Sequence, residues 1–543
     1  MPRTIHQRLY TAGQTRELDR LAVAGGIAGF DLMQRAGTVL LRVVQERWPG
    51  ARELLIFTGP GNNGGDGLVL AALAKQCGLA VEVHALAPVE KLKGEAGSAR
   101  DLAVRHEVAI EEATPDGIAE ALQRRCQRGG APGCVVVDAM LGTGIRGEVR
   151  PPYREAIEQI NRSTLPVLAV DVPSGLDSDT GCIAGVAISA AVTVSFIGLN
   201  RGLFTADGPD QRGELVFDRL AVPGDLYEQA SVWPPSAWRL TVQTVLPWLP
   251  SRTLATHKGD CGRVVVAGGD CGYGGAALLC AEAAARSGAG TVCLLTRSEH
   301  VAPSLSRRPE VMVRGLDEAS LQPGDLLPAM LPALQSATAL VAGPGLGQSE
   351  WSVAVLRQLI QWQRDNGLPL VLDADALVLL GRAGELSLPE PLPDLTVLTP
   401  HPGEAARLLA CSVADVQADR FAAAQALQQR WGGVALLKGV GTVVCYPQDG
   451  GVAMAGGPAA IGMDICTEGN PGMATGGMGD VLAGLAGGLL AQRMPLDRAV
   501  RAAVAIHGES ADLAAGEGGE RGMLASDLMP FIHRLVSQQR RQA

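Results

Sequence analysis

From residue 53 to about residue 220, short, continuously apolar runs alternate with helical stretches. Examples are ELLIFTG (53–59), CVVVDAM (134–140) and PVLAVDV (166–172), and residues 65–77 between them have helical spacing. Such alternation is typical of right-handed β–α–β crossovers that build a parallel sheet covered on both faces. We therefore predict a Rossmann-like, doubly wound α/β sheet over residues 1–222.

A second pattern of the same kind begins at GRVVVAGG (262–269). It continues through strands such as ALVAGPG (339–345) and TVLTPH (396–401), and helical segments follow NPGMATGGMGD (470–480). The pattern predicts a second α/β domain over residues 256–543.

The segment 223–255 between the two patterns has a different composition. Its prolines and tryptophans are Pro223, Pro234, Pro235, Pro247, Pro250, Trp233, Trp238 and Trp248. Prolines break regular structure, but three tryptophans are too apolar for a loose tether. We predict a linker that packs onto its neighbours.

Composition and charge restrict the possible functions. Hydrophobic residues make up 47% of the 543 positions and charged residues 19%, so the chain is expected to be globular. Aromatic residues are only 3% and the net charge is −10, which disfavours partners rich in phosphate, such as nucleic acid or an anionic membrane. Eleven scattered cysteines form no C-x-x-C pair, and no apolar run reaches the roughly 18 residues of a membrane span. We expect a cytoplasmic protein without nucleic-acid or membrane partners.

The first glycine-rich loop, GPGNNGGDG (59–67), follows a strand and precedes a helix. It satisfies G-x-G-x-x-G, and Glu82 lies near the position of a ribose-binding acid, which favours an ordinary dehydrogenase. Against this, Pro60 stiffens the turn and Asp66 places a negative charge in the first helical turn. Asn62, Asn63 and Asp66 together suit a polar ligand or a hard cation better than a bare pyrophosphate.

Two further strand ends carry oxygen ligands. Asp138 is followed by the loop 142–148, and Asp171 is followed by Ser174. Because the carboxyl ends of parallel strands line the ligand crevice, we expect these groups to converge with the first loop. The structural alternative is that each aspartate caps a turn.

NPGMATGGMGD (470–480) ends in Asp480 at the start of an apolar helix. Gly476, Gly477 and Gly479 would let free backbone N–H groups close on a phosphate. A carboxylate beside a phosphate needs a chemical role or a cation, and the alternative is that Asp480 caps the helix. Upstream, LLKGVGTVV (436–444) offers Lys438 to a nucleotide without forming a P-loop motif.

The motifs of the first half resemble those of a known family. YTAGQTRELDRLA (10–22), GNNGGDG (61–67), VDAMLGTGIRGE (137–148) and AVDVPSGLDSDTG (169–181) are similar to the N-terminal domain of the bifunctional NAD(P)H-hydrate repair enzymes. The resemblance covers about residues 10–220 and implies epimerisation between the R and S forms of hydrated NADH and NADPH.

The resemblance also implies site residues for the first half. The hydrate would contact Asn62, Asn63, Gly64, Gly65, Asp66, Gly142, Thr143, Gly144, Ile145, Arg146, Gly147, Glu148 and Asp171. Asn63, Asp138 and Ser174 would coordinate a potassium ion, in keeping with their oxygen atoms. Asp171 and Asp138 are both candidates for proton transfer, and the sequence leaves open which of them acts.

The second half resembles the ribokinase-like small-molecule kinases and, more closely, the dehydratase domain of the same repair family over about residues 250–540. GPGLG (343–347), DADAL (373–377), TPHPGE (399–404) and KGVGT (438–442) carry this resemblance. It implies that the hydroxyl of the S hydrate is phosphorylated and that phosphate then leaves.

Site residues for the second half follow from the same resemblance. The nucleotide would contact Lys438, Gly439, Val440, Gly441, Thr442 and Gly479. The hydrate would contact Ala276, Gly347, His401 and Asp480, with Asp480 as the base that takes the hydroxyl proton. Arg307 and Arg308 meet either cofactor phosphates or solvent.

The leading hypothesis is therefore a bifunctional metabolite-repair enzyme, an isomerase followed by a lyase. It would use ADP with Mg²⁺, release AMP and phosphate, take NADHX and NADPHX as substrates, and assemble as a homo-oligomer. One alternative is a ribokinase-like small-molecule kinase fused to a ligand-binding Rossmann-like domain. A non-enzymatic alternative treats the first domain as an interaction module.

Overall fold

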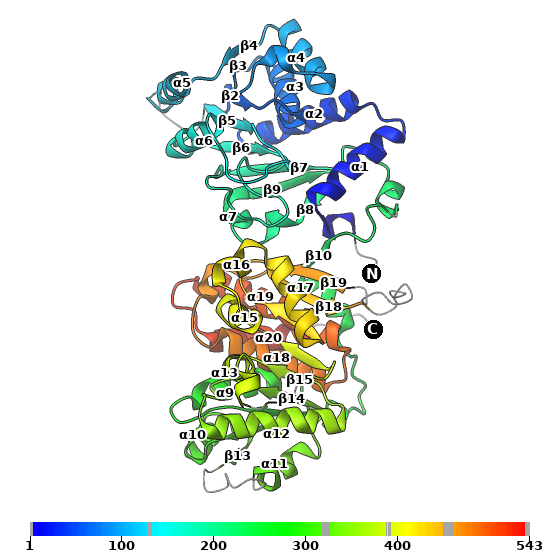
Figure 1. Ribbon diagram of the computed structural model, residues 1–543, viewed down its shortest axis with the longest axis vertical. Coiled ribbons are helices and arrows are strands. Elements are labelled where there is room, and N and C mark those ends of the chain that lie inside the picture. Colours follow the sequence, from blue (N-terminus) through cyan, green and yellow to red (C-terminus); the bar gives the residue numbers. More distant parts are fainter. Residues whose placement is uncertain are drawn as a thin grey trace. The chain divides into compact units, whose positions relative to one another are not determined.

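The computed structural model describes residues 4–127, 133–229, 231–316, 326–386, 388, 392–448 and 461–537. Contacts divide the chain into two compact units, Pro2–Trp238 and Arg239–Ala543, which we call the first and second units. Each unit carries a parallel sheet with helices, so the prediction of two α/β parts is confirmed (Figure 1). The division falls inside the segment 223–255.

The sheet of the first unit is parallel throughout. Its strands in spatial order are β4 (Ala109–Glu112), β3 (Ala80–Ala85), β2 (Glu53–Thr58), β5 (Cys134–Ala139), β6 (Val167–Val170), β7 (Val192–Phe196) and β9 (Glu214–Asp218). The helices are α1 (Ala12–Ala24), α2 (Gly29–Arg47), α3 (Asn62–Gln76), α4 (Gly94–Arg105), α5 (Pro115–Gln127), α6 (Tyr153–Arg162) and α7 (Gly208–Arg212).

Alternate residues of each central strand enter two different cores. On β2, Leu54 and Ile56 pack with residues of α1 to α4, while Leu55 and Phe57 pack with residues of α5 and α6. All four side chains are fully buried. The continuous apolar runs read from the sequence therefore reflect a sheet that is covered on both faces.

The order of the strands places a switch point between β2 and β5. From β2 the chain proceeds outward to β3 and β4, and from β5 it proceeds in the other direction to β6, β7 and β9. The loops that follow β2 and β5 therefore run in opposite directions across the sheet. The crevice between such loops is where open α/β sheets bind ligands. A Cβ atom on Gly59 would lie 1.8 Å from the carbonyl oxygen of Met140, so these two loops touch where only glycine fits.

Two short strands and the first two residues of a third complete the first unit. β1 (Arg8–Tyr10) pairs in parallel with β8 (Leu199–Asn200) and antiparallel with the start of β10 (Ala237–Leu240). Trp233 and Trp238 stack edge to face with their ring centroids 5.6 Å apart, and Arg8 lies 4.8 Å above the ring of Trp233. This part of the predicted linker is thus packed onto the first unit.

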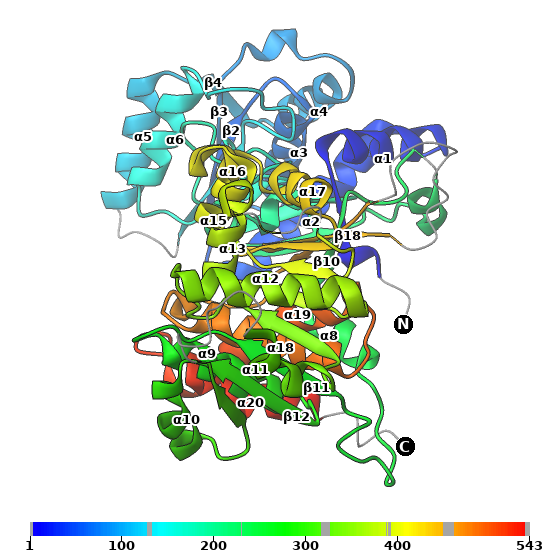
Figure 2. The same cartoon turned by 60° about the horizontal axis from the view of Figure 1, so that its bottom comes forward.

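The second unit has a longer sheet that is parallel until its last strands. In spatial order its strands are β13 (Met312–Gly315), β12 (Thr291–Thr296), β11 (Arg263–Ala267), β14 (Ala339–Ala342), β15 (Leu370–Leu372), β16 (Thr396–Leu398), β17 (Val434–Leu437), β18 (Thr442–Pro447) and β19 (Ile461–Cys466). β18 is antiparallel to both β17 and β19. Figure 2 shows β11 and β12, which are parallel neighbours, side by side.

Helices of varied length connect these strands. They are α8 (Val242–Val245), α9 (Gly274–Arg286), α10 (Val301–Arg307), α11 (Leu326–Leu334), α12 (Glu350–Asn366), α13 (Asp375–Leu380), α14 (Ala383–Leu386), α15 (Pro402–Leu409), α16 (Val413–Ala418), α17 (Arg420–Trp431), α18 (Met478–Ala491), α19 (Leu496–Gly518) and α20 (Met529–Val536).

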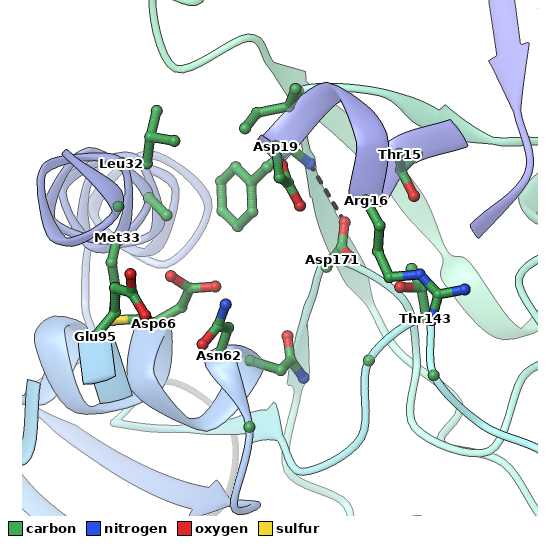
Figure 3. A pocket seen from close by; sticks show the side chains of 18 of the residues that line it. Thr15, Arg16, Asp19, Leu32, Met33, Asn62, Asp66, Glu95, Thr143 and Asp171 are labelled. Atoms are coloured by element: carbon green, nitrogen blue, oxygen red, sulfur yellow. Dashed lines mark hydrogen bonds between the residues drawn. The ribbon is translucent and has the colours of Figure 1, made fainter. Parts of the chain in front are cut away.

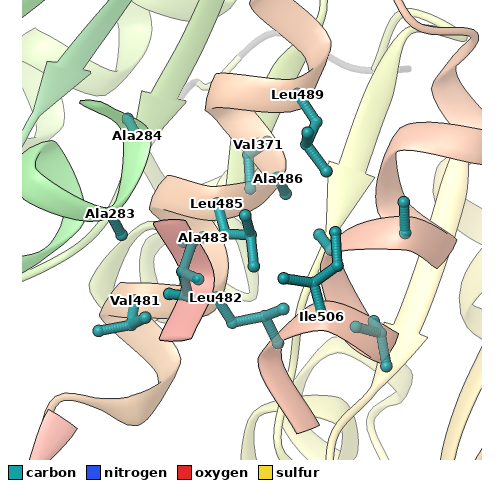
Figure 4. Close-up of a cluster of buried hydrophobic side chains, with 14 of the residues drawn as sticks. Ala283, Ala284, Val371, Val481, Leu482, Ala483, Leu485, Ala486, Leu489 and Ile506 are labelled. Atoms are coloured by element: carbon teal, nitrogen blue, oxygen red, sulfur yellow. The ribbon is translucent and has the colours of Figure 1, made fainter. Parts of the chain in front are cut away.

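The helix α18 lies in the core of the second unit. Its apolar side chains surround it on all sides and pack against Ala283 and Ala284 of α9, Val371 of β15 and Ile506 of α19 (Figure 4). A Cβ atom on Gly484 would lie 2.0 Å from the carbonyl oxygen of Cys280, so glycine permits the close approach to α9. The smooth apolar run after Asp480 is therefore a fully buried helix.

The second sheet has its own switch point, between β11 and β14. A Cβ atom on Gly268, which follows β11, would lie 2.1 Å from the carbonyl oxygen of Pro344, which follows β14. This glycine contact holds the two loops together above the sheet edge.

Two expectations from the sequence concern disulfide bonds and membrane-spanning helices. None of the eleven cysteines, all of which the structure describes, forms a disulfide bond. Across the residues that the structure describes, no helix combines the length and apolarity needed to cross a membrane.

Candidate active sites

A cavity of about 890 Å³ lies at the switch point of the first unit. Its walls come from α1, α2, the start of α3, and the loops that follow β5 and β6 (Figure 3). The predicted hydrate contacts that line it are Asn62, Asn63, Asp66, Gly142, Thr143, Gly144, Ile145 and Asp171. Loops that are remote in sequence thus meet as the positions of the strand ends led us to expect.

The other predicted hydrate contacts lie outside the cavity lining. A Cβ atom on Gly64 would lie 2.1 Å from the carbonyl oxygen of Gly59, and one on Gly65 would lie 2.6 Å from the Cε atom of Met33. These two glycines therefore let α3 pack closely against its neighbours. Arg146 and Gly147 are exposed, and Glu148 forms an ion pair of 3.5 Å with Arg154.

Asp171 has the geometry expected of a functional carboxyl. Its φ angle is 64°, an unusual backbone conformation that often marks functional sites. The carboxylate accepts hydrogen bonds from Ser195 Oγ at 3.3 Å and from the N–H of Phe196 at 3.5 Å. Burial raises the pKa of Asp171 to about 6, although these hydrogen bonds oppose the shift. A carboxyl poised near neutrality can both give and take a proton.

Asp138 lies beneath the cavity and is fully buried. It accepts hydrogen bonds from Ser174 Oγ at 2.5 Å and from the N–H groups of Ser174 and Met140 at 2.7 and 3.2 Å. Burial raises the pKa of Asp138 to about 6, against the effect of these hydrogen bonds. Because it does not line the cavity, the structure favours Asp171 over Asp138 for proton transfer.

The side-chain amide atoms of Asn63 are buried. Neither its Oδ1 nor its Nδ2 atom has a hydrogen-bond partner in the described part of the chain. Buried polar groups are normally satisfied, so an unpaired amide oxygen at this position fits a cation or water site.

The cavity also contains residues that the sequence reasoning missed. Thr15, Arg16 and Asp19 project from α1, and Glu95 comes from α4 (Figure 3). Burial and the negative charge of Asp171 raise the pKa of Asp19 to about 7. Thr15 and Asp19 are four residues apart in a helix, a spacing that could have identified this shared face.

Asp66 faces the same carboxyls from α3. Burial, together with the charges of Asp171 and Asp19, raises the pKa of Asp66 well above its usual range. Three carboxyls therefore share one cavity and cannot all ionise readily.

The dehydrogenase interpretation of Glu82 is wrong. Glu82 is the third residue of β3, paired in register with Leu55, and does not lie at the strand end. Its carboxylate contacts Arg125 at 2.6 Å and His84 at 2.7 Å. It therefore takes part in a local ion-pair cluster away from the cavity.

In the second unit, Asp480 is the third residue of α18. Gly477, with a φ angle of 93°, is the N-cap residue, so the interpretation of Asp480 as the helix cap is wrong. The Asp480 carboxylate accepts no hydrogen bond within the described chain. Burial and the nearby charge of Asp373 raise the pKa of Asp480 to about 7, while Lys438 acts in the opposite direction. An unengaged carboxylate with this pKa is suited to act as a base.

Lys438 lies directly beside this turn. Its Nζ atom is 2.7 Å from Asp373 Oδ1 and 3.9 Å from Glu404 Oε2. A Cβ atom on Gly479 would lie 3.2 Å from that Nζ atom, so glycine at 479 leaves room for the lysine. Burial lowers the pKa of Lys438, but the negative charges of Asp373 and Glu404 have the larger, opposite effect. The pKa of the lysine is therefore raised. The sequence reasoning assigned no role to Asp373 or Glu404, although both lie in the motifs quoted for the resemblance.

The loop after β14 is fixed by carboxylates. The N–H of Gly347, whose φ angle is 72°, donates to Asp375 Oδ2 at 2.9 Å. A Cβ atom on Gly347 would lie 2.7 Å from Asp270 Oδ2, and Arg297 binds the other oxygen of Asp270 at 2.7 Å. Ala276, at the start of α9, lies against Gly345 of the same loop. Two of the predicted hydrate contacts, Ala276 and Gly347, thus meet at the switch point.

His401 caps α15. Its Nδ1 atom accepts a hydrogen bond from the N–H of Gly403 at 2.9 Å. Burial and the charge of Lys438 lower the pKa of His401. The structure therefore gives the neutral imidazole a structural role next to Glu404, and its half-exposed ring remains accessible.

The predicted nucleotide segment forms the turn between β17 and β18. Gly439 and Gly441 have φ angles of 137° and 60°, and Val440 between them is exposed. Thr442 Oγ1 donates to the carbonyl oxygen of Gly439 at 3.0 Å.

Arg308 is one of the two arginines considered for cofactor phosphates. It forms an ion pair with Glu282.

Comparisons with known proteins cover both units. The family described as NAD(P)H-hydrate dehydratase matches residues 264–534, and the family described as YjeF-related protein N-terminus matches residues 29–202. The bifunctional NAD(P)H-hydrate repair enzyme Nnr of Coxiella burnetii is 44% identical over 529 residues, which is 97% of this chain and 99% of that protein. The corresponding enzyme of Escherichia coli K12 is 40% identical over 544 residues, covering 99% of this chain and 95% of that protein.

The chain is also similar to a solved structure. The ADP/ATP-dependent NAD(P)H-hydrate dehydratase of Bacillus subtilis, co-crystallised with ATP and Mg²⁺, is 27% identical with a TM-score of 0.45. It covers 54% of this chain and 96% of that chain.

The full-length matches confirm the resemblance found in the sequence motifs and do not favour a kinase fused to a ligand-binding domain. Relatives named as bifunctional repair enzymes, at 40–44% identity, extend over nearly the whole chain. The chain belongs to the family of bifunctional NAD(P)H-hydrate repair enzymes.

Proposed function

We propose that the chain repairs hydrated NADH and NADPH in two steps, epimerisation in the first unit and nucleotide-dependent dehydration in the second. The single observation that carries the proposal is that each unit holds one available carboxyl with a raised pKa, Asp171 in the lining of the cavity and Asp480 in the turn beside Lys438. The identity of the substrate is inferred from membership of the chain in the repair-enzyme family.

In the first unit, Asp171 handles the proton of the hydroxyl on the hydrated ring. Reversible opening at the hydroxyl-bearing carbon needs proton transfer but no redox step, so the R and S forms can interconvert. Asp19 and Asp66 hold further protons in the same cavity, which keeps one carboxyl protonated while another is ionised.

In the second unit, Asp480 takes the proton of the substrate hydroxyl as its oxygen bonds to the terminal phosphoryl group of the nucleotide. The backbone N–H groups at the start of α18 then hold charge on the transferred group. When phosphate leaves with the electron pair of the carbon–oxygen bond, the neighbouring carbon loses a proton and the ring double bond is restored. With ADP the other product is AMP.

Mg²⁺ is expected with the nucleotide, where it neutralises phosphate charge. The carboxylate oxygens of Asp373 and Glu404 beside the Lys438 ammonium fit a hard cation. The choice of ADP over ATP, the homo-oligomeric state and the cytoplasmic location stay predictions.

The test of the proposed function is direct. The protein is incubated with a mixture of R- and S-hydrated NADH and either ADP or ATP with Mg²⁺, and the absorbance of reduced nicotinamide is followed. Recovery of all the hydrate, including the R form, is expected. No recovery with either nucleotide would exclude the repair function.

We expect potassium to stabilise the first unit through Asn63, Asp138 and Ser174. A ligand bound tenfold above its dissociation constant contributes about 1.4 kcal/mol to the free energy of unfolding. Thermal unfolding should therefore occur at a higher temperature in KCl than in LiCl of equal ionic strength. Asn63→Leu should remove the difference, and equal melting temperatures of the unchanged protein in the two salts would argue against the site.

The pH dependence of dehydration should report Asp480. Because the pKa of this carboxyl is raised to about 7, the rate should fall as pH drops below about 7 and the base becomes protonated. Lys438→Gln removes the ammonium that lowers this pKa, so the midpoint should move to higher pH. Lys258→Gln, at an exposed position of the same unit, is the control. An unchanged midpoint in Lys438→Gln would show that the fall of the rate at low pH reports the titration of another group.

A further inference from the structure

The cavity of the first unit has an uneven distribution of charge. Asp19, Asp66, Glu95 and Asp171 place carboxyl groups in its lining. Arg16 and Arg20 bring guanidinium groups to the same lining from α1. A ligand that carries both a neutral reacting ring and negative phosphates would be oriented by this arrangement.

Arg16 is not engaged by the protein. Within the described parts of the chain, its guanidinium has no ion-pair, hydrogen-bond or ring partner. Arg20, one turn further along α1, differs because Glu17 holds it through two contacts of 2.7 Å. Arg16 thus keeps its full binding capacity for a ligand.

Unpaired backbone donors lie next to Arg16. Figure 3 shows its side chain extending from α1 toward Thr143, in the loop that follows β5. The N–H groups of Gly142, Thr143 and Gly144 donate to no acceptor among the described residues. The space above Gly144 is open, since a Cβ atom there would meet nothing within 4 Å. A guanidinium beside free N–H groups is a setting that favours phosphate.

The remaining lining makes other positions less suitable for phosphate. A pyrophosphate beside Asp19, Asp66 and Asp171 would meet like charges, whereas the hydrated ring carries no charge and needs carboxyls for proton transfer. Arginine also suits the role better than lysine, because its planar group can form two hydrogen bonds to one phosphate.

We propose that Arg16, together with the backbone of Gly142 to Gly144, binds a phosphate of the hydrated dinucleotide and turns the hydrated ring toward Asp19, Asp66 and Asp171. This inference rests on the proposed epimerase function and adds the residue that orients its substrate. Arg16 acts in binding and takes no part in proton transfer.

The test combines one substitution with a truncated substrate. Epimerisation is measured for the unchanged protein and for Arg16→Gln with two substrates, hydrated NADH and the hydrate of reduced nicotinamide riboside, which carries no phosphate. With hydrated NADH, KM should rise about 10-fold or more while kcat changes little, because a charged hydrogen bond is lost. With the riboside hydrate, the two proteins should have the same KM. Arg20→Gln is the matched control and should change KM less than about twofold, since Glu17 already neutralises Arg20.

Two outcomes of the kinetic comparison would contradict the inference. Equal losses with both substrates would show that Arg16 merely supports the cavity, and an unchanged KM for hydrated NADH would place the phosphates elsewhere, for example at the start of α3. If the unchanged protein failed to interconvert the hydrates, the proposed function would be wrong, and titration with NADH would still test Arg16. A binding event lost in Arg16→Gln would support the phosphate contact, while identical isotherms would overturn it.

Discussion

Asp480→Asn should lower the rate of dehydration by about 10²–10⁴-fold and leave epimerisation unchanged. The amide keeps the size and shape of the carboxyl at the third position of α18 but cannot accept the hydroxyl proton. The measurement is the recovery of reduced-nicotinamide absorbance from the S hydrate, together with chromatographic interconversion of the R and S forms. A parallel loss of both activities would show that the two sites are wrongly assigned.

The stability of this variant provides the check on folding. The pKa of Asp480 is raised from 3.8 to about 7, so the folded state binds a proton more tightly than the unfolded state. The stabilising contribution of this group is present below pH 4 and is lost as pH rises through about 7. Asp480→Asn should therefore melt at the same or a higher temperature than the unchanged protein at pH 8. Asp415→Asn, in the first turn of the exposed helix α16, is the control and should retain dehydration.

Asp171→Asn should have the reciprocal effect, with epimerisation reduced by about 10²–10⁴-fold and dehydration of the S hydrate retained. Asparagine tolerates the φ angle of 64° at this position, so the backbone should remain in place. In a mixture of hydrates with nucleotide present, the S form should disappear while the R form persists. The R form is quantified by chromatography, with correction for spontaneous interconversion.

The matched control for this second substitution is Asp116→Asn, at an exposed position in the first turn of α5. It changes the net charge of the first unit by the same amount without touching the cavity. If Asp171→Asn still interconverted the hydrates at the normal rate, proton transfer would have to be assigned to Asp19 or Asp66.

Much of the fold was predictable because both sheets leave a direct record in the sequence. Strands such as 54–57 are apolar without interruption since they are covered on both faces, and each is followed by a glycine-rich or acidic turn. Parallel strands place those turns at one edge, so Asn62, Asp171 and the loop 142–148 could be assigned to one site from the sequence. Of that loop, residues 142–145 line the cavity. Asp480 and the glycines before it were identified differently, from the free N–H groups at the start of the apolar helix that follows them.

The roles of individual residues within those motifs were less predictable. Gly64 and Gly65 belong to the same glycine-rich loop as Asn62, but they serve the packing of α3 and do not line the cavity. Asp138 and Asp171 both end buried strands, yet only Asp171 reaches the cavity. A motif gives the position of a residue along the chain, while the direction of its side chain depends on the helix or turn that it enters.

The sequence by itself determined the two α/β units, the edges at which their chemistry gathers, and the choice of family, because these follow from local periodicity and from motifs within single loops. Only the tertiary structure decided which side chains share a cavity. Asp19 and Arg16 lie on α1, far in sequence from Asp171, and their contribution depends on how that helix packs beside the sheet. The raised pKa values of Asp171 and Asp480 likewise arise from burial and neighbouring charges, which exist only after the chain has folded.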